Sequence, residues 1–173
     1  MTHPTITVRP ATTADVKSIQ AIRQAHIGAV LLGRELVDLY ESVPEFLVAV
    51  DENGLVVGAG GLHVMWEDLA EVRSIVVSDA ARGRGVGRAI VEALVEKARS
   101  LGIKRLFCLT FEVEFFSKSG FEVISDVPVD AETYAEMVRS NDDGVAEFLD
   151  LARVNRTPWA TRGCLSCSNL RFG

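Results

Sequence analysis

The feature that most constrains the fold is a run of alternate glycines that leads directly into a helical pattern. Residues 80–98 read Ala-Ala-Arg-Gly-Arg-Gly-Val-Gly-Arg-Ala-Ile-Val-Glu-Ala-Leu-Val-Glu-Lys-Ala, with glycine at positions 83, 85 and 87. The run Leu69–Val77 before it is rich in apolar residues and predicts a strand. A strand, a flexible turn and a helix in direct succession indicate an α/β domain.

The loop Arg82–Arg88 has the chemistry of an anion site at a helix N-terminus. Without Cβ atoms at the glycines, successive backbone N–H groups can converge on an oxyanion, and the helix dipole and three arginines favour its charge. A nucleoside triphosphate loop is excluded, because Gly87 is followed by Arg88 and Ala89 instead of Lys and Ser or Thr. A dinucleotide fingerprint would need a third glycine at position 88. A pyrophosphate group is compatible with this loop. The alternative is that the loop binds no ligand and is a flexible turn with solvated arginines.

The rest of the chain alternates between strand and helix patterns. The expected strands are Thr5–Arg9, Phe46–Val50, Leu55–Val64, Leu69–Val77, Leu106–Thr110 and Phe121–Ile124. The expected helices are Ala14–Ala25, Arg34–Ser42, Gly87–Ser100, Glu114–Ser119 and Ala131–Ser140, with Thr12 or Thr13 as a cap for the first. The hairpin around Asn53-Gly54 needs antiparallel neighbours and the strand-helix-strand unit a parallel pair, so we expect a mixed sheet.

Length and charge limit the classes of function. A chain of 173 residues, 48% of them hydrophobic, suits one domain, which we place at residues 5–152 with a C-terminal segment, an edge strand plus tail, at 153–173. The net charge of −6 provides no broad basic face, so we expect neither nucleic acid nor membrane as a partner. The N-terminus has no signal-peptide pattern and no long apolar run, which predicts a cytoplasmic protein.

The three cysteines do not form a disulfide framework. Cys108 lies in an apolar run and reads as a small buried hydrophobe. Cys164 and Cys167 form a single Cys-x-x-Cys near the chain end, but zinc usually takes four ligands and no second pair lies nearby. We therefore predict no metal site and an ordinary tail.

Taken together, these motifs resemble the GNAT superfamily of acyl-CoA-dependent N-acyltransferases. Arg82-x-x-Gly85-x-Gly87 resembles the family signature for the coenzyme A pyrophosphate, and Phe115-Phe116-Ser117-Lys118-Ser119-Gly120-Phe121 resembles a late family segment. The resemblance covers roughly residues 6–127 and implies acetyl-CoA as co-substrate. It also implies a GNAT-type mixed, mostly antiparallel sheet flanked by helices.

A narrower resemblance is to the short, stand-alone N-acetylglutamate synthases. It rests on Leu31-Leu32-Gly33-Arg34 with Leu39-Tyr40-Glu41, Ala70-Glu71-Val72-Arg73, Leu106-Phe107-Cys108-Leu109-Thr110, and Phe115-Phe116 with Gly120-Phe121. This resemblance implies acetyl transfer to the α-amine of L-glutamate, the first step toward arginine, and is compatible with a homodimer. The alternatives are another small amine or a protein N-terminus as acceptor, or a non-catalytic acetyl-CoA-binding regulatory module.

Glu71 is the candidate general base. A carboxylate in a partly desolvated cleft can accept the proton of an ammonium, and Glu71 matches the glutamate that these synthases are thought to use. The alternative is a structural ion pair with Arg73, which lies two residues further on the same strand face. A tyrosine, the usual GNAT acid, is replaced by Phe116, so the general acid is unassigned.

The resemblance also implies the residues that bind the two substrates. The expected cofactor-binding residues are Ile75, Val76, Val77, Arg82, Gly83, Arg84, Gly85, Val86, Gly87, Arg88 and Phe116. The expected acceptor-binding residues are Leu32, Arg34, Ser74, Thr161 and Arg162. Arginine forks suit the two carboxylates of glutamate, although Arg34 could also be a surface charge at a helix start. Gly163–Cys167 replaces the aliphatic strand that the family places after Thr161 and Arg162.

Overall fold

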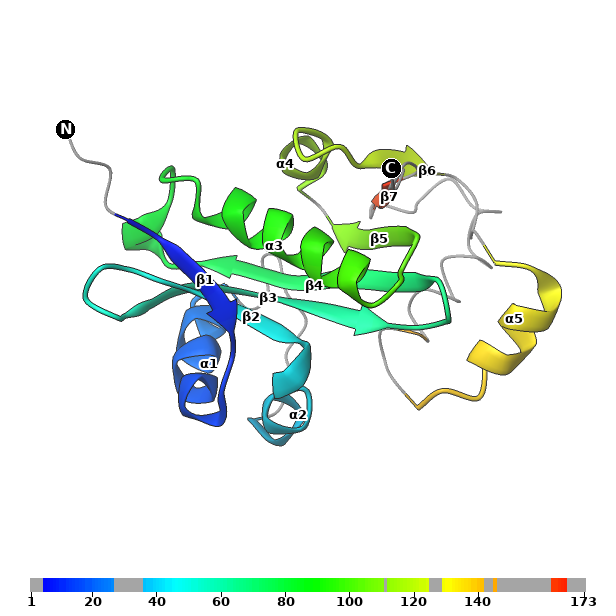
Figure 1. The fold of residues 1–173 in the computed structure, drawn as a ribbon, viewed down its shortest axis with the longest axis horizontal. Coiled ribbons are helices and arrows are strands. Elements are labelled where there is room, and N and C mark those ends of the chain that lie inside the picture. The colour runs from blue at the N-terminus through cyan, green and yellow to red at the C-terminus, as the bar shows by residue number, and fades with distance from the viewer. Residues whose placement is uncertain are drawn as a thin grey trace. The chain divides into compact units, whose positions relative to one another are not determined.

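A computed structural model of the chain describes residues 5–26, 36–110, 112–124, 129–141, 145 and 163–167. Its strands are β1 Thr7–Pro10, β2 Phe46–Val50, β3 Val56–Val64, β4 Leu69–Val77, β5 Arg105–Thr110, β6 Glu122–Ile124 and β7 Gly163–Cys167. Its α-helices are α1 Val16–Gln24, α2 Leu36–Glu41, α3 Val86–Ser100, α4 Val113–Ser117 and α5 Ala131–Met137, with short 3₁₀ turns η1 Thr13–Asp15, η2 Val43–Glu45 and η3 Asp79–Ala81. Figure 1 shows the labelled elements.

The chain forms two compact units. The first comprises Met1–His63 and Val72–Leu101, and the second comprises Val64–Glu71 and Gly102–Gly173, so that β4 contributes residues to both. The pairings confirm the expected mixed sheet: β1 with β2, β2 with β3, β5 with β7 and β6 with β7 are antiparallel, whereas β4 with β5 is parallel.

In the first unit, α1 and α2 cover one face of the strands and α3 covers the other (Figure 1). The first face carries a core of apolar side chains drawn from both helices and three strands: Val16, Ile19, Leu39, Phe46, Val48, Ala59 and Val76. The β2–β3 turn is built as the sequence predicts, since the Asp51 carboxylate accepts hydrogen bonds from the backbone N–H groups of Asn53 and Leu55.

Two glycines let α3 lie close to β3. A Cβ on Gly60 would lie 2.4 Å from Ile75 Cδ1 and 2.7 Å from Ile90 Cγ2. A Cβ on Gly58 would lie 2.9 Å from Ile90 Cδ1 and 3.0 Å from the carbonyl oxygen of Val76. These positions need glycine because no larger side chain fits between strand and helix. The close approach fixes α3, and with it the loop that precedes α3.

The entry to α1 is held by a buried carboxylate. Both oxygens of Asp15 accept hydrogen bonds from the Arg9 guanidinium, at 2.8 and 2.9 Å, and Oδ2 also accepts from the backbone N–H of Thr12. Thr12 is the N-cap of the short turn η1, whereas the N-cap of α1 itself is Asp15, so the expected threonine cap of the first α-helix is wrong. The hydrogen bonds from Arg9 outweigh the effect of burial and lower the pKa of Asp15 to about 2.

Replacing Asp15 by asparagine should destabilise the protein most above pH 4. Because the folded-state pKa lies below the unfolded value, this carboxylate stabilises the fold above its unfolded pKa, and the contribution disappears as the pH falls toward 2. We expect the free energy of unfolding to fall by about 1–2 kcal/mol at pH 7. Urea denaturation of both proteins at pH 7 and pH 3 measures it. An equal difference at both pH values would contradict the assignment.

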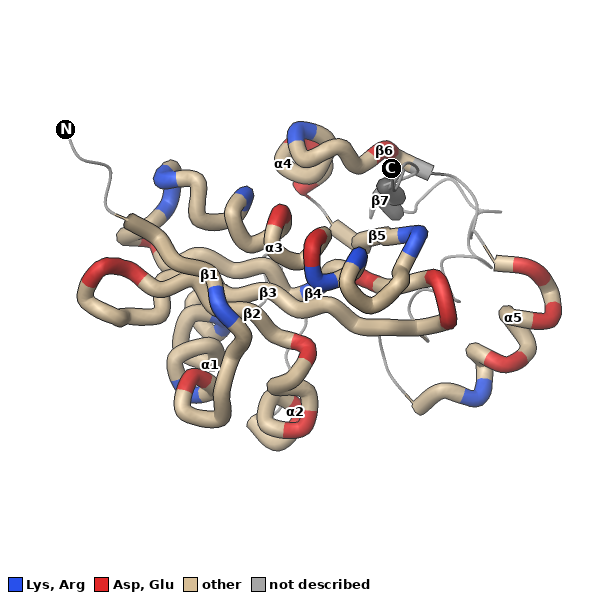
Figure 2. The backbone as a smooth tube through the Cα atoms, viewed as in Figure 1, with Lys and Arg blue, Asp and Glu red and all other residues tan. Residues whose placement is uncertain are grey.

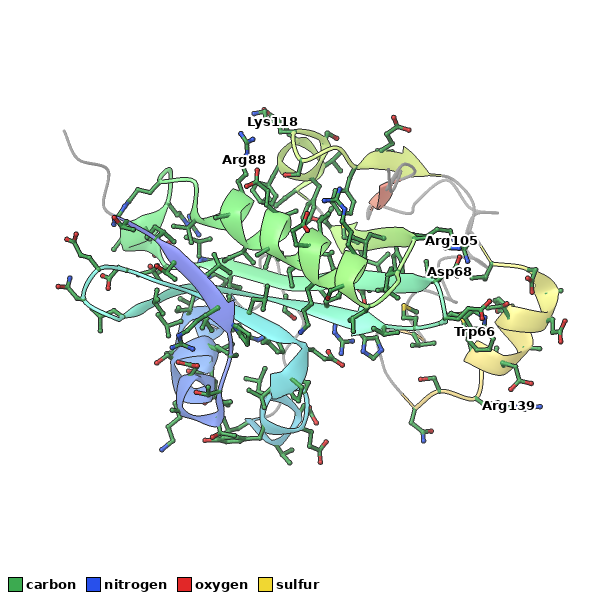
Figure 3. The ribbon with its side chains drawn as sticks, in the orientation of Figure 1. Trp66, Asp68, Arg88, Arg105, Lys118 and Arg139 are labelled. Carbon is green, nitrogen blue, oxygen red and sulfur yellow. The ribbon has the colours of Figure 1, made fainter. Side chains whose placement is uncertain are left out.

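In the second unit, the first residues of β4 pair with the first residues of β5, in the register Leu69 to Arg105 and Glu71 to Phe107. A bidentate ion pair anchors this register, with Arg105 Nε and Nη2 each 2.9 Å from an Asp68 carboxylate oxygen (Figure 3). The unit has its own core of Leu69, Phe107, Met137 and Val145.

The described part of the C-terminal segment 153–173, for which an edge strand plus tail was expected, is a strand at an interior position of its sheet. Residues Gly163–Cys167 form β7, which lies between β5 and β6 and pairs antiparallel with both. Cys164 and Cys167 therefore belong to a strand, and Cys108 opposite Leu165 is buried as expected. No helix within the described ranges is long and apolar enough to cross a membrane.

Candidate active site

The β4–α3 turn has the geometry of an anion-binding loop. After β4 the chain makes the η3 turn, passes through extended backbone at Arg82 and adopts positive φ at Gly83 (+74°) and Gly85 (+76°). Helix α3 then begins at Val86, and its first internal hydrogen bond runs from Ala89 N to Gly85 O, at 3.0 Å. The N–H groups of the first helical turn precede that bond and have no intrahelical acceptors.

Glycine is needed in this loop for conformation and not for space. A Cβ at position 83 or 85 would meet nothing within 4 Å, but both positions have the left-handed backbone that other residues rarely adopt. In Figure 2 this turn carries the blue of arginine residues, whereas the β2–β3 turn carries the red of acidic residues. Although the chain as a whole is acidic, it has a local basic site at the N-terminus of its longest described helix, where the helix dipole also favours an anion.

The arginines of the loop are exposed. The side chain of Arg82 is 61% exposed and its Nε lies 3.1 Å from Asp79 Oδ1. Arg84 is exposed, and Arg88 projects from the first turn of α3 (Figure 3) with Nε donating to Glu92 Oε1 at 2.8 Å. Val86 is buried, so it would contribute its backbone N–H; Gly87 follows it in the first helical turn.

The second half of β4 contains an irregular residue. Ser74 has a φ of +58°, the one positive φ among the described residues other than glycine. A non-glycine residue in this conformation is strained, and such strain is frequent at functional sites. Ile75 and Val77 are half-buried, whereas Val76 belongs to the core of the first unit. Ser74 is therefore an irregular residue within β4, and Ile75–Val77 complete the strand before the turn to the glycine loop.

Glu71 lies in the first half of β4, opposite Phe107 of β5, and is only 5% exposed. A buried carboxylate in this position has the desolvation that a general base needs. Arg73, the residue offered by the sequence as its structural partner, donates from Nη2 to Glu45 Oε2 at 2.7 Å. Arg73 thus has an ion-pair partner from a distant part of the chain.

The Glu45 carboxylate contacts two basic side chains, His63 and Arg73. This cluster was not predicted from the sequence. Its Oε1 lies 2.8 Å from His63 Nδ1, while its Oε2 accepts from Arg73. Lys97 of α3 donates to the backbone oxygens of Pro44 and Glu45. Burial alone would raise the pKa of Glu45, but the hydrogen bond from His63 and the charge of Arg73 hold that pKa below its ordinary value. No spacing rule links Glu45, His63 and Arg73 along the sequence.

Phe116 is 6% exposed and packs edge-on against Phe115 and Phe121, with ring centroids 5.0 and 5.4 Å apart. These contacts make it a core residue of α4, and a contact with coenzyme A stays a prediction. Leu32, Arg34, Thr161 and Arg162 lie outside the described residues. Among the described residues, no group of three or more His, Cys, Asp or Glu side chains could hold a metal ion.

The comparisons with known proteins agree with one another. Residues 20–121 match the model of the acetyltransferase (GNAT) family. The chain is 51% identical over 149 residues to the amino-acid acetyltransferase of Mycobacterium tuberculosis, an alignment that covers 85% of this chain and 86% of that protein. The crystal structure of Rv2747 from Mycobacterium tuberculosis in complex with CoA and NLQ has a TM-score of 0.87 and 46% identity, covering 95% of this chain and 99% of that one.

A more distant structure shares the fold. N-acetylglutamate synthase from Neisseria gonorrhoeae, complexed with coenzyme A and N-acetyl-glutamate, has a TM-score of 0.71 and 24% identity, and it covers 94% of this chain but 34% of that one. The family match spans more than half of the chain, and it includes β4, the glycine loop and α3. The chain belongs to the GNAT acetyltransferase family.

Proposed function

We propose that the chain is an acetyl-CoA-dependent amino-acid N-acetyltransferase whose acceptor is the α-amine of L-glutamate. The observation that carries the proposal is the β4–α3 loop, with two left-handed glycines opening a 15-residue helix. Its donors suit a pyrophosphate, which coenzyme A contains. The name of the 51% identical relative, amino-acid acetyltransferase, supports the acceptor class.

The chemistry needs few groups from the protein. Acetyl-CoA supplies an activated thioester, so the chain must position the amine, accept its proton and stabilise charge on the carbonyl oxygen. In the proposal, Arg82–Arg88 hold the pyrophosphate and the backbone of Ser74–Val77 receives the pantetheine arm. Glu71 accepts the ammonium proton, directly or through water, so that the nitrogen can form the new bond to the acetyl carbon. The C–S bond breaks and the coenzyme A thiolate leaves.

The acceptor side of the proposal rests on the sequence. Arg34 and Arg162 would pair with the carboxylates of glutamate, and Leu32, Ser74 and Thr161 would line its site. An arginine left unpaired in a desolvated site costs about 1–3 kcal/mol, so glutamine should react about 5- to 150-fold more slowly than glutamate in kcat/KM. A cytoplasmic location and a homodimer stay predictions, which cell fractionation and light scattering test.

The test is thiol release from acetyl-CoA against a panel of L-glutamate, L-glutamine, other amino acids, polyamines and peptides. We expect glutamate to have the highest kcat/KM. If glutamine reacted faster than glutamate, the site would bind a neutral amide in place of the second carboxylate. Acetylation of an amino-acid α-amine would still be supported. A polyamine or peptide acetylated far faster than any amino acid would overturn the proposal. If none of the amines in the panel were acetylated, the regulatory-module alternative would be favoured.

A further inference from the structure

A histidine at the end of α1 contacts the first arginine of the glycine loop. His26 directly follows the C-cap residue of α1, and its Nε2 is hydrogen-bonded to Arg82 Nη2. Arg82 Nε lies 3.1 Å from Asp79 Oδ1, and the same carboxylate oxygen lies 3.7 Å from His26 Nε2. All three residues belong to the first compact unit.

The contacts of His26 define which ring nitrogen carries the hydrogen. Nδ1 lies 2.8 Å from the backbone oxygen of Ile22, and a carbonyl oxygen only accepts hydrogen bonds. Nδ1 is therefore the donor, and Nε2 keeps its lone pair in the neutral ring. Since a guanidinium has no lone pair to offer, the bond to Arg82 runs from Nη2 to Nε2. The backbone of α1 thus sets the tautomer that receives the arginine.

This arrangement leaves Arg82 able to bind an anion. His26 takes one N–H of Nη2, and Asp79 forms an ion pair on the Nε side of the guanidinium, so neither contact uses the N–H groups of Nη1 or the second N–H of Nη2. The His26 side chain is 13% exposed and that of Arg82 is 61% exposed. A well-packed acceptor therefore restrains a long, exposed side chain. Restraint before binding lowers the conformational entropy that a ligand contact costs.

We propose that His26 is a positioning residue for coenzyme binding: through neutral Nε2 it holds Arg82 in the orientation that meets the pyrophosphate. The inference deepens the proposed function and rests on it for the ligand of the loop. Neither the glycine motif nor the chain spacing points to His26, because 56 residues separate it from Arg82.

Substitutions at position 26 test the inference, with coenzyme A binding measured by calorimetry in the absence of any acceptor. His26→Ala should raise Kd about three- to tenfold, as expected for one charge-assisted hydrogen bond in a partly exposed setting. His26→Gln should restore most of the affinity, because its carboxamide reaches the position of Nε2. His26→Asn is the matched control, since its carboxamide reaches only the position of Nδ1, and it should behave like alanine. In turnover assays, KM for acetyl-CoA should rise while kcat stays near wild type.

A double-mutant cycle separates the possible outcomes. Arg82→Ala should weaken binding, and adding His26→Ala to it should cause no further loss. An equal loss from His26→Ala in both backgrounds, or failure of His26→Gln to rescue, would overturn the positioning role. If Arg82→Ala itself left Kd unchanged, the loop's part in the proposed function would fail and the inference with it. If Arg82→Ala weakened binding but His26→Ala left Kd unchanged, the inference would be overturned while the proposed function would stand. Thermal unfolding of each variant shows whether it is folded.

Discussion

Glu71→Gln should lower kcat by about two to four orders of magnitude while the Kd for acetyl-CoA changes little. The substitution keeps the size of the side chain but removes the proton acceptor from a residue that is 5% exposed. An α-amine is mostly protonated at neutral pH, so without a base only the small unprotonated fraction reacts. The deficit should therefore narrow as the pH rises past the pKa of the amine.

Saturating kinetics from neutral to alkaline pH, together with calorimetry, measure both quantities. Glu96→Gln is a matched control, because Glu96 is an exposed glutamate of α3 whose described contact is with Arg99. It should leave kcat and Kd at wild-type values. Near-full turnover of Glu71→Gln at neutral pH would assign Glu71 to the structural alternative.

Gly85→Val should weaken acetyl-CoA binding about 10- to 100-fold. The left-handed backbone of Gly85, with φ of +76°, aims the amides of the loop and the first turn of α3. A β-branched residue resists that conformation, so the loop must shift, and each lost N–H contact to a charged oxygen is worth about 1.5–3 kcal/mol. No side chain is displaced, because nothing lies within 4 Å of the new Cβ. The variant should therefore remain folded.

Gly54→Val supplies the comparison for Gly85→Val. Gly54 has a φ of +77° and also nothing within 4 Å of its Cβ position, but it lies in the β2–β3 turn. Both variants should lose about 1–2 kcal/mol of stability, and only Gly85→Val should lose affinity in calorimetry. If the two variants bound acetyl-CoA equally well, the loop would not be the coenzyme site.

Local patterns predict the first unit well. Phe46–Val50 and Leu69–Val77 are strands with the predicted bounds, and α3 begins one residue before its predicted start. Each has a local cause: continuous apolar residues in the strands, and glycines followed by a helical stripe in α3. Most remaining differences are shifts of one or two residues at element ends, where capping and fraying compete, whereas α5 ends three residues before its predicted end at Ser140.

The missed features depend on contacts between distant residues. β7 contains Gly163, Ser166 and two cysteines, a composition of low strand propensity, and it forms because β5 and β6 lie on either side of it. The bond from Arg82 to His26 and the ion pair of Glu45 with Arg73 link residues 56 and 28 positions apart. Side chains of these types are most often solvated, so nothing in the sequence marks them as partners.

The place of β7 also sets an order for folding the second unit. Strands β5 and β6 come early in the unit's sequence, yet they have to stay apart until residues 163–167 enter between them. Closing such a long loop costs entropy before any ladder hydrogen bond repays it, so this insertion should be a slow step. Until it happens, β5 presents an unpaired edge of apolar residues, Leu106–Leu109, which can pair with another chain. The unpaired β5 edge should therefore make the second unit prone to aggregation while it folds, whereas β2 and β3 of the first unit pair across a short turn.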